Sequence, residues 1–282
     1  MRPLLVLLGC KLFTENVSQA LHPALGMELF HNFSLIHDDI MDQAPVRRGR
    51  PAVYRKWNTN VAILSGDAMI IKAYEELLKT DSSVALQVIQ LFNKTAIEVC
   101  EGQQFDMDFE LRDDVTIDEY LNMIRLKTAV LLAACLKIGA IIGGASENQA
   151  QLLYDFGINS GIAFQLQDDI LDAYGESAKV GKQQGGDIIA NKKTFLLLKA
   201  QELASENEHT ELTNWLTGTH KNLDKVNGVL ELFRKLNVKE LAEREMWQFF
   251  NNGLASLDKV EGNEEWKQVL KQFSTQLMHR EH

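Results

Sequence analysis

The sequence predicts an all-α fold on three observations. Only four prolines occur in 282 residues and none follows Pro51, so most of the chain lacks the strongest helix breaker. Apolar residues recur at helical spacing, as in the stripe formed by Ile117, Leu121 and Ile124. No run of alternating apolar and polar residues indicates a strand. We therefore expect helices throughout and no strands.

The helices are expected to form a single large domain over residues 1–282, with antiparallel helices around a central hydrophobic cavity. The first is a buried helix that includes the short apolar run Leu4–Leu8. No linker rich in Gly, Ser or Pro separates two domains, and turn-forming segments divide the chain into roughly ten helices. These segments are Ala44–Pro51, Thr80–Ser83, Arg112–Thr116, Gly143–Ser146, Gly175–Gly186 and Gly218–His220.

Composition excludes several classes of protein. The net charge of −10 argues against a nucleic-acid-binding protein. No apolar stretch is long enough for a membrane span, so stable membrane insertion is not expected. The cysteines Cys10, Cys100 and Cys135 are odd in number and widely spaced, so we expect small buried side chains in a reducing, cytoplasmic compartment, without disulfides or zinc.

Two segments of similar sequence carry clustered acids. Ser34–Asp42 reads SLIHDDIMD, and Phe164–Asp172 reads FQLQDDILD. Residues four apart share a helix face, where like charges repel, and aspartate is a poor helix former. One such cluster could be a solvated helix face, but two copies inside apolar helices favour metal binding. Carboxylates without His or Cys select hard cations such as Mg²⁺. The expected metal ligands are Asp38, Asp42, Asp168 and Asp172.

Basic residues follow each acid cluster. Arg47 and Arg48 come directly after the first, and Lys182 and Lys192 lie in a Gly- and Lys-containing segment after the second. Lys127 stands alone in an apolar helix. Such residues could be solvated loops or a side chain that extends to water, but beside carboxylates they are suited to holding phosphate.

His31 and Gln165 share the helix faces of the acids. His31 lies seven residues before Asp38, and Gln165 lies three before Asp168. A histidine in this position could also be an ordinary core residue. Acids for Mg²⁺, bases for phosphate and an apolar interior together indicate a substrate with a diphosphate at one end and a hydrocarbon at the other.

The chain resembles the trans-isoprenyl diphosphate synthases, or polyprenyl synthetases, from Arg2 to about Lys193, with the motifs in order. These motifs are Asp38–Asp42 followed by Arg47-Arg48-Gly49, then Gly102-Gln103 with Asp106, Lys127-Thr128, Phe164–Asp172, Gly186-Asp187 and Lys192. The resemblance implies the isoprenoid synthase fold, a homodimer and a prenyltransferase activity.

The resemblance also implies a role for each matching residue. Three Mg²⁺ ions per site, for which Mn²⁺ can substitute, would be held around an allylic diphosphate by Asp38, Asp42 and Asp168, with support from Asp172. The groups that contact this diphosphate would be Arg47, Lys127, Lys182 and Lys192. Thr128 and Gln165 would line the reacting carbon. Isopentenyl diphosphate would be held by Arg2, His31 and Arg48.

The implied reaction joins isopentenyl diphosphate to dimethylallyl, geranyl or farnesyl diphosphate. Metals and bases stabilise the departing diphosphate, the double bond attacks the allylic cation, and a proton is lost. Phe33 lies five residues before Asp38, where its ring would block a growing chain, whereas Ser34 leaves room. This pattern resembles short-chain enzymes that make farnesyl or geranylgeranyl diphosphate.

Two other functions remain open. A class I terpene cyclase shares the first motif and the fold, but its second motif usually mixes Asn, Ser or Thr with Glu, and it needs no Arg47-Arg48 pair. A non-catalytic subunit of a heteromeric synthase is supported by one departure: only Arg2-Pro3 matches the family's G-G-K-x-x-R-P segment. The lysine and the helix expected before it are absent. For a catalytic chain, we expect the carboxylates of Asp38 and Asp168 to approach within roughly 8–12 Å, because one diphosphate bridges them.

Overall fold

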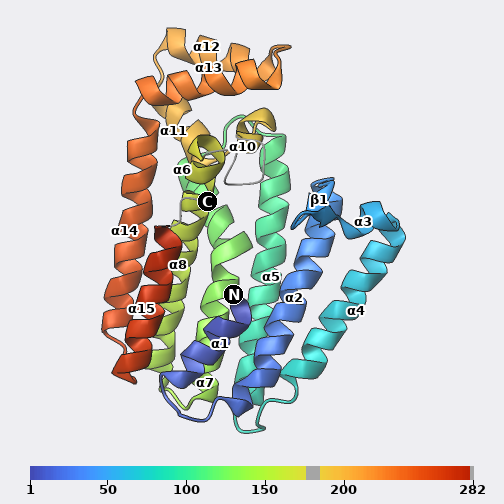
Figure 1. Cartoon of the computed structure of the whole chain (residues 1–282), viewed down its shortest axis with the longest axis vertical. Coiled ribbons are helices and arrows are strands. Elements are labelled where there is room, and N and C mark those ends of the chain that lie inside the picture. Colours follow the sequence, from blue (N-terminus) through green and yellow to red (C-terminus); the bar gives the residue numbers. More distant parts are fainter. Residues whose placement is uncertain (176–184, 280–282) are drawn as a thin grey trace. The chain divides into compact units, whose positions relative to one another are not determined.

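The computed structural model describes residues 1–175 and 185–279 and confirms the all-α fold (Figure 1). Its elements are α1 (Arg2–Lys11), η1 (Ser18–Ala20), α2 (Leu21–Met41), β1 (Val46–Arg47), β2 (Arg50–Pro51), α3 (Val53–Lys56), α4 (Thr59–Leu77), α5 (Ala85–Glu110), α6 (Ile117–Ile124), η2 (Arg125–Ala129), α7 (Val130–Ile142), α8 (Glu147–Tyr174), α10 (Gly186–Ile189), α11 (Phe195–Leu203), α12 (Glu206–Thr217), α13 (Asn222–Lys235), α14 (Val238–Asp258) and α15 (Glu264–Met278). The helix breaks expected around residues 80–83, 112–116, 143–146 and 218–220 all fall between helices.

The expectation that the chain contains no strands is wrong at one place. The segment after α2 forms a small antiparallel hairpin in which Val46 pairs with Pro51, and Arg47 with Arg50. Arg48 and Gly49 turn the chain with φ values of 53° and 73°, and positive φ at both central residues matches the twist of a two-residue hairpin. Strands of two residues are too short to show alternation in the sequence, so the Arg-Gly turn was the only available signal.

The chain divides into two compact units, each described by itself below. Unit 1 comprises Met1–Ile97, Leu131–Asp155 and Lys259–Gln268. Unit 2 comprises Glu98–Val130, Phe156–Asp258 and Val269–His282. The single domain over residues 1–282 stays a prediction.

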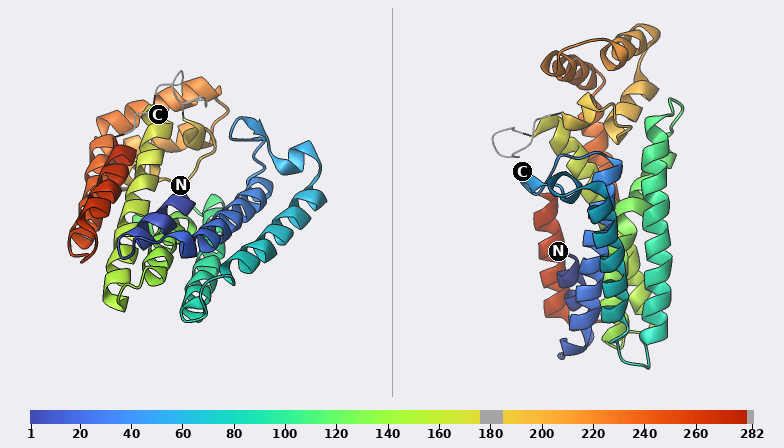
Figure 2. Two further views of the ribbon diagram at one scale, coloured as in Figure 1. Left: turned by 60° about the horizontal axis from the view of Figure 1, so that its bottom comes forward. Right: turned by 90° about the vertical axis from the view of Figure 1, so that its right-hand side faces the viewer.

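In unit 1, α2 and α4 run side by side, and α1 packs on α2 (Figures 1 and 2). The core includes the fully buried Phe30 of α2 and Phe92 of α5, whose rings meet edge to face with 5.2 Å between centroids. Glycine allows the closest helix contact, because a Cβ on Gly139 would lie 2.0 Å from the carbonyl oxygen of Val6. The amphipathic pattern read from the sequence therefore becomes a tightly packed layer of helices.

In unit 2, the hydrophobic core is built mainly from α6, α8, α11, α13 and α14, and α12 lies beside α13 (Figure 1). Capping boxes start two of these helices: Thr116 with Glu119 at α6, and Ser205 with Glu208 at α12. One expectation fails here. Cys100 is exposed, whereas Cys10 and Cys135 are buried as expected, because Cys100 lies on the outer face of α5.

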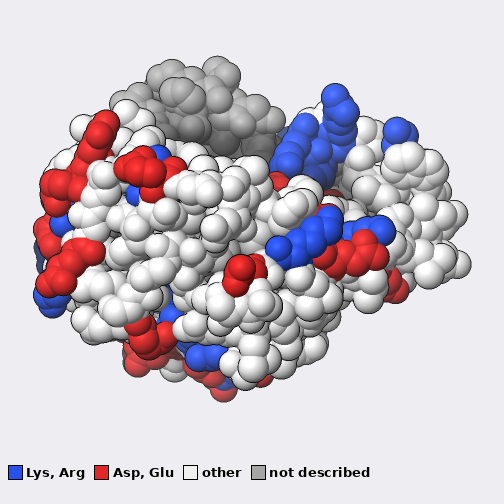
Figure 3. Space-filling view, turned by 90° about the horizontal axis from the view of Figure 1, so that it is seen from below, with Lys and Arg blue, Asp and Glu red and all other residues white. Residues whose placement is uncertain are grey.

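The surface of the described residues has few features of a membrane-spanning chain. Among the described helices, none is both long and apolar enough to cross a bilayer. On the face shown in Figure 3, acidic and basic side chains lie in small groups around a broad uncharged area.

Candidate active site

The first acid cluster, Asp38, Asp39 and Asp42, lies at the C-terminal end of α2. The helix ends at Met41, and the N–H of Asp42, the capping residue, donates to the carbonyl oxygen of Asp38 at 2.8 Å. Asp39 is buried, Asp38 is half-buried and Asp42 is exposed. The C-terminal end of a helix carries partial negative charge and disfavours carboxylates. Three aspartates in this position therefore need cationic partners.

Arg47 in the hairpin supplies one such partner. Its Nε donates to Oδ1 of Asp39 at 2.8 Å, and its Nη2 donates to Oδ2 of Asp38 at 3.4 Å. Burial lowers the pKa of Arg47, but the hydrogen bond to Asp39 and the charges of the three aspartates outweigh burial and raise it. Sequence reasoning assigned no role to Asp39, which orients Arg47 from a position only 2% exposed.

Arg2, His31 and Arg48 lie near one another in unit 1, since the charges of both arginines act on the imidazole. His31 is 7% exposed, and burial together with the charges of Arg2 and Arg48 lowers its pKa to about 3. The imidazole is therefore neutral at pH 7 and is surrounded by cations. The buried Nε of Arg2 has no hydrogen-bond partner among the described residues. This group of donors suits an anion.

Phe33 and Ser34 lie half-buried on α2. The ring of Phe33 lies 5.6 Å from that of Phe30 and 4.8 Å from that of His37, centroid to centroid. The hydroxyl of Ser34 donates to the carbonyl oxygen of His31 at 2.9 Å. Phe33 thus belongs to a row of rings along α2, one or two turns before the acids.

The second acid cluster, Asp168, Asp169 and Asp172, lies in the last turns of α8. Oδ2 of Asp172 accepts the backbone N–H of Asp187 at 2.9 Å, and its carbonyl oxygen accepts the N–H of Gly185 at 2.7 Å. Gly185 has a φ of 74°, which favours glycine. The segment that starts at Gly185 is thereby held against the end of α8. Lys182, a predicted diphosphate contact, lies outside the described residues.

Asp169 is the buried member of this cluster, at 5% exposed. Burial and the nearby charge of Asp187 raise its pKa to about 7, against the opposing effects of hydrogen bonds from Tyr120 and Gln165 and of the charge of Lys192. The hydroxyl of Tyr120 donates to Oδ2 of Asp169. Sequence reasoning missed Tyr120. The available signal was that the hydroxyl of a buried tyrosine needs a hydrogen-bond partner.

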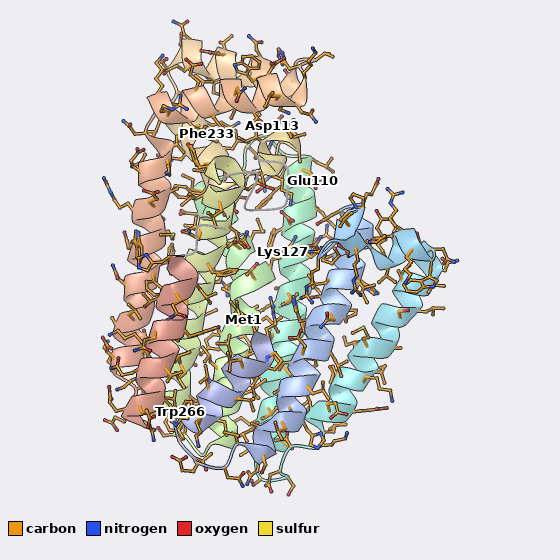
Figure 4. The ribbon with its side chains drawn as sticks, viewed as in Figure 1. Met1, Glu110, Asp113, Lys127, Phe233 and Trp266 are labelled. Carbon is orange, nitrogen blue, oxygen red and sulfur yellow. The ribbon has the colours of Figure 1, made fainter. Side chains whose placement is uncertain are left out.

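Lys127 and Thr128 lie in η2, a π-helical segment between α6 and α7, and such segments are frequent at functional sites. Nζ of Lys127, which Figure 4 labels, donates to Oδ2 of Asp106 on α5 at 2.5 Å. Gly102 permits this approach, since a Cβ there would lie 2.3 Å from the backbone nitrogen of Lys127. The hydroxyl of Thr128 donates to Oε1 of Gln165 at 3.3 Å. Unit 2 therefore brings Lys127, Thr128 and Gln165 together.

Comparison with known proteins decides the family. The family model for polyprenyl synthetases matches residues 1–233 of this chain. The chain belongs to the polyprenyl synthetase family. The family assignment expected from the sequence is thereby confirmed, and neither alternative function is favoured.

Relatives within the polyprenyl synthetase family carry related names. The chain is 44% identical to geranylgeranyl diphosphate synthase of Methanosarcina mazei over 72% of this chain and 63% of that protein, which is less than two thirds of its length. It is 37% identical to a short chain isoprenyl diphosphate synthase of Methanothermobacter thermautotrophicus over 100% of this chain and 86% of that protein. A geranylgeranyl pyrophosphate synthetase structure from Pyrococcus horikoshii is 33% identical, with a TM-score of 0.94 over 100% of this chain and 86% of that one.

The acid clusters fit a magnesium site of this family by their chemistry. Each offers oxygen donors only, partly accessible and placed at the negative end of a helix. Among the described residues, no three or more His, Cys, Asp or Glu side chains converge in metal-binding geometry. Mg²⁺ takes one or two carboxylates and completes its shell with water and phosphate oxygens, so the oxygen donors of the clusters are of the type it binds.

Proposed function

We propose that the chain is a short-chain trans-prenyltransferase. It condenses isopentenyl diphosphate with dimethylallyl, geranyl or farnesyl diphosphate to give farnesyl or geranylgeranyl diphosphate. The observation that carries the proposal is the pairing, in each unit, of a carboxylate cluster at a helix end with basic and polar groups. The names of the relatives, geranylgeranyl and short-chain isoprenyl diphosphate synthases, support the product class.

In this proposal, unit 1 binds isopentenyl diphosphate through Arg2, His31 and Arg48. The unpartnered Nε of Arg2 and the neutral imidazole of His31 support this role, because both can donate to a phosphate oxygen. Arg47 binds the allylic diphosphate. It exchanges its contacts with Asp39 and Asp38 for phosphate oxygens as substrate arrives.

Asp38, Asp42 and Asp168 hold about three Mg²⁺ ions, with Asp172 in support and Mn²⁺ as a substitute. When bound, these ions neutralise the charge that develops on the departing diphosphate. The expectation that the carboxylates of Asp38 and Asp168 approach within roughly 8–12 Å, because one diphosphate bridges them, stays a prediction.

Lys127, Lys192 and the undescribed Lys182 contact the same diphosphate in this proposal. The oxygens of Thr128 and Gln165 face the reacting carbon, where an acceptor oxygen stabilises positive charge. The double bond of isopentenyl diphosphate forms the new carbon–carbon bond, and a proton then leaves to the released diphosphate. Water is excluded throughout, since it would trap the cation.

We also propose a homodimer in the cytoplasm. Large apolar side chains on α4 and at its C-cap are exposed in unit 1, with Leu64 at 67%, Ile71 at 60% and the capping Leu78 at 64%. Their spacing of seven residues places them in one row along the helix. A second copy of the chain would cover this row and remove it from water. The sequence support for the cytoplasm is the odd number of unpaired cysteines.

The deciding experiment incubates the protein with Mg²⁺, isopentenyl diphosphate and each allylic diphosphate in turn, and then sizes the dephosphorylated products. Products of fifteen or twenty carbons support the proposal. Cyclic hydrocarbons from an allylic diphosphate alone would indicate a cyclase. No product in the presence of either Mg²⁺ or Mn²⁺, with a folded dimer, would favour a non-catalytic subunit.

A further inference from the structure

A chain of hydrogen bonds in unit 2 links three elements. The hydroxyl of Tyr120 on α6 donates to Oδ2 of Asp169 on α8. Oδ1 of the same carboxylate accepts Nε2 of Gln165 at 3.2 Å, and Oε1 of Gln165 accepts the hydroxyl of Thr128 in η2 at 3.3 Å. Of these four residues, only Gln165 and Thr128 were assigned to the reaction by their motifs. Tyr120 lies at the buried end of this series of hydrogen bonds.

The geometry assigns each oxygen of Asp169 a different donor. One oxygen is held by the phenol of Tyr120 and the other by the amide nitrogen of Gln165. A carboxylate held at both oxygens cannot rotate freely about its terminal torsion, so it presents a fixed acceptor to Gln165. That acceptor selects the orientation of the amide, because an amide nitrogen donates to it and an amide oxygen does not.

We propose that Tyr120 is a positioning residue for the reaction, acting through Asp169 to set the amide of Gln165. With the nitrogen of Gln165 held by Asp169, its oxygen faces Thr128. This inference rests on the proposed prenyl transfer, in which Gln165 and Thr128 lie beside the reacting carbon. Tyr120 itself touches no reacting atom in this scheme.

The orientation of the amide decides the sign of the local field. An amide oxygen beside the allylic carbon stabilises the positive charge that develops there, whereas an amide nitrogen with its hydrogens opposes it. Without the phenol, one oxygen of the buried Asp169 loses its partner and the carboxylate can turn. Gln165 then samples both orientations, so turnover falls while the binding of isopentenyl diphosphate, assigned to unit 1, is unaffected.

A merely structural role for Tyr120 makes a different prediction. Its ring belongs to the hydrophobic core of unit 2, and Tyr120→Phe keeps that ring and removes only the hydroxyl. Tyr174 at the end of α8 is a matched control, because its buried hydroxyl has no hydrogen-bond partner among the described residues. Tyr174→Phe therefore removes a buried hydroxyl from the same unit without touching the hydrogen-bond chain.

The test is a double-mutant cycle in single-turnover experiments with the full chain. Tyr120→Phe should lower the rate of the chemical step about tenfold, the middle of the range for coupled residues in one network, and leave the KM for isopentenyl diphosphate within about twofold. In a Gln165→Ala background it should have no further effect. Tyr174→Phe should match the wild type in both backgrounds. Equal effects of Tyr120→Phe with and without Gln165 would overturn the inference.

A second readout needs no activity. The side-chain amide signals of Gln165, assigned in an ¹⁵N NMR spectrum by their loss in Gln165→Ala, should shift or broaden in Tyr120→Phe and stay in place in Tyr174→Phe. Unmoved signals would overturn the positioning role even if the protein proved inactive, whereas an inactive wild type with moved signals would contradict only the proposed function. If Tyr120→Phe fails to fold, Asp169→Asn replaces it, because the amide leaves one acceptor oxygen for two donors. Shifted signals of Gln165 would again support the positioning role, and unmoved signals would overturn it.

Discussion

The two acid clusters have nearly the same sequence, but their buried aspartates bond to different kinds of side chain. Each lies at the C-terminal end of a long helix, and in each the middle aspartate is buried, with Asp39 2% and Asp169 5% exposed. Asp39 meets a cation, Arg47, eight residues later in a hairpin. Asp169 meets a neutral phenol, Tyr120, from a helix 49 residues earlier. The same motif therefore pairs its buried carboxylate with a cation in unit 1 and with neutral hydrogen-bond donors in unit 2.

The outer aspartates differ in the same manner. Asp42 is an exposed helix cap, whereas Asp172 holds the backbone of the segment at Gly185 and Asp187. The repeat thus supplies two carboxylate positions but not two equivalent sites. The first cluster has exposed groups beside it, such as Asp42 and Arg48, whereas buried or part-buried contacts hold the second.

Despite this difference, the first aspartate of each cluster should be equally indispensable. Asp38→Ala and Asp168→Ala should each lower kcat by about 10²–10³, as the loss of a preorganised transition-state contact does. The exposed Asp258, paired only with Lys271 at 3.2 Å, gives a control in Asp258→Ala that should stay near wild type. Steady-state kinetics with Mg²⁺ measures all three. A loss of kcat in only one of the two variants would show that the two motifs are not functionally equivalent.

The sequence predicted what is local and missed what is distant. Arg47 follows its acids within ten residues, so its association with the cluster could be read directly. Lys127 was predicted as a site residue, but its partner Asp106 lies 21 residues away. The signal for this pairing was that Gly102 and Asp106 share one face of α5, where the backbone of Lys127 approaches the helix.

Tyr120 could not be paired from the sequence, because its contact with Asp169 depends on how α6 packs on α8. The hairpin was missed for the opposite reason: its strands are shorter than any periodicity that a sequence can show. Cys100 was expected to be buried on residue type alone, and only the packing of α5 decides its exposure.

The buried histidine of unit 1 should make folding sensitive to acid. The pKa of His31 is about 3 in the folded chain and about 6.5 unfolded, so below pH 6.5 the unfolded state binds the extra proton and stability falls until about pH 3. At pH 5 the loss from this group is about 2 kcal/mol. Urea unfolding of the wild type and of His31→Gln, each at pH 7 and pH 5, isolates this contribution, because the other titrating groups are common to both proteins.

His31→Gln should remove that loss, and replacement of the exposed His209 by Gln should not. Asp169 in unit 2 changes the free energy of unfolding with pH in the opposite direction, so the two groups can be told apart. Its pKa of about 7 is raised above the unfolded value, so its contribution to stability declines as the pH rises from about 4 to 7. An unchanged pH dependence in His31→Gln would place the acid sensitivity elsewhere.

The two arginines of the hairpin should separate the two substrates. Arg47, bound to the acids, should serve the allylic diphosphate, and Arg48, beside His31, should serve isopentenyl diphosphate. Replacement of each by Ala should raise the KM for its own substrate about tenfold, the lower range for one lost charged contact. Arg50, exposed and opposite Arg47 in the hairpin, is the control. Identical effects of Arg47→Ala and Arg48→Ala on both substrates would refute the assignment.

Phe33 marks the last difference between the two motifs, since the corresponding position of the second motif is the small, fully buried Ala163. A hydrocarbon tail that extends from Asp38 back along α2 would meet the ring of Phe33, which packs against Phe30 and His37. Phe33→Ala makes the first motif like the second at this position. It should lengthen the products from fifteen or twenty carbons to twenty-five or more. Because Phe33 is half-buried, its stability cost should fall below the roughly 3–5 kcal/mol of a fully buried ring.

Phe249 on α14 is also half-buried and gives the matched control, so Phe249→Ala should lose comparable stability and leave the products unchanged. Chain lengths are read by chromatography of the dephosphorylated products, and folding by circular dichroism. Because the ring narrows the path without touching the diphosphate, turnover in Phe33→Ala should stay within a few-fold of wild type, the smallest change in rate expected for any variant at the acid clusters. A folded, active variant with an unchanged product distribution would show that Phe33 is ordinary core. The limit to growth would then belong to its neighbour Phe30 or to Met27, one turn further from the acids on the same helix.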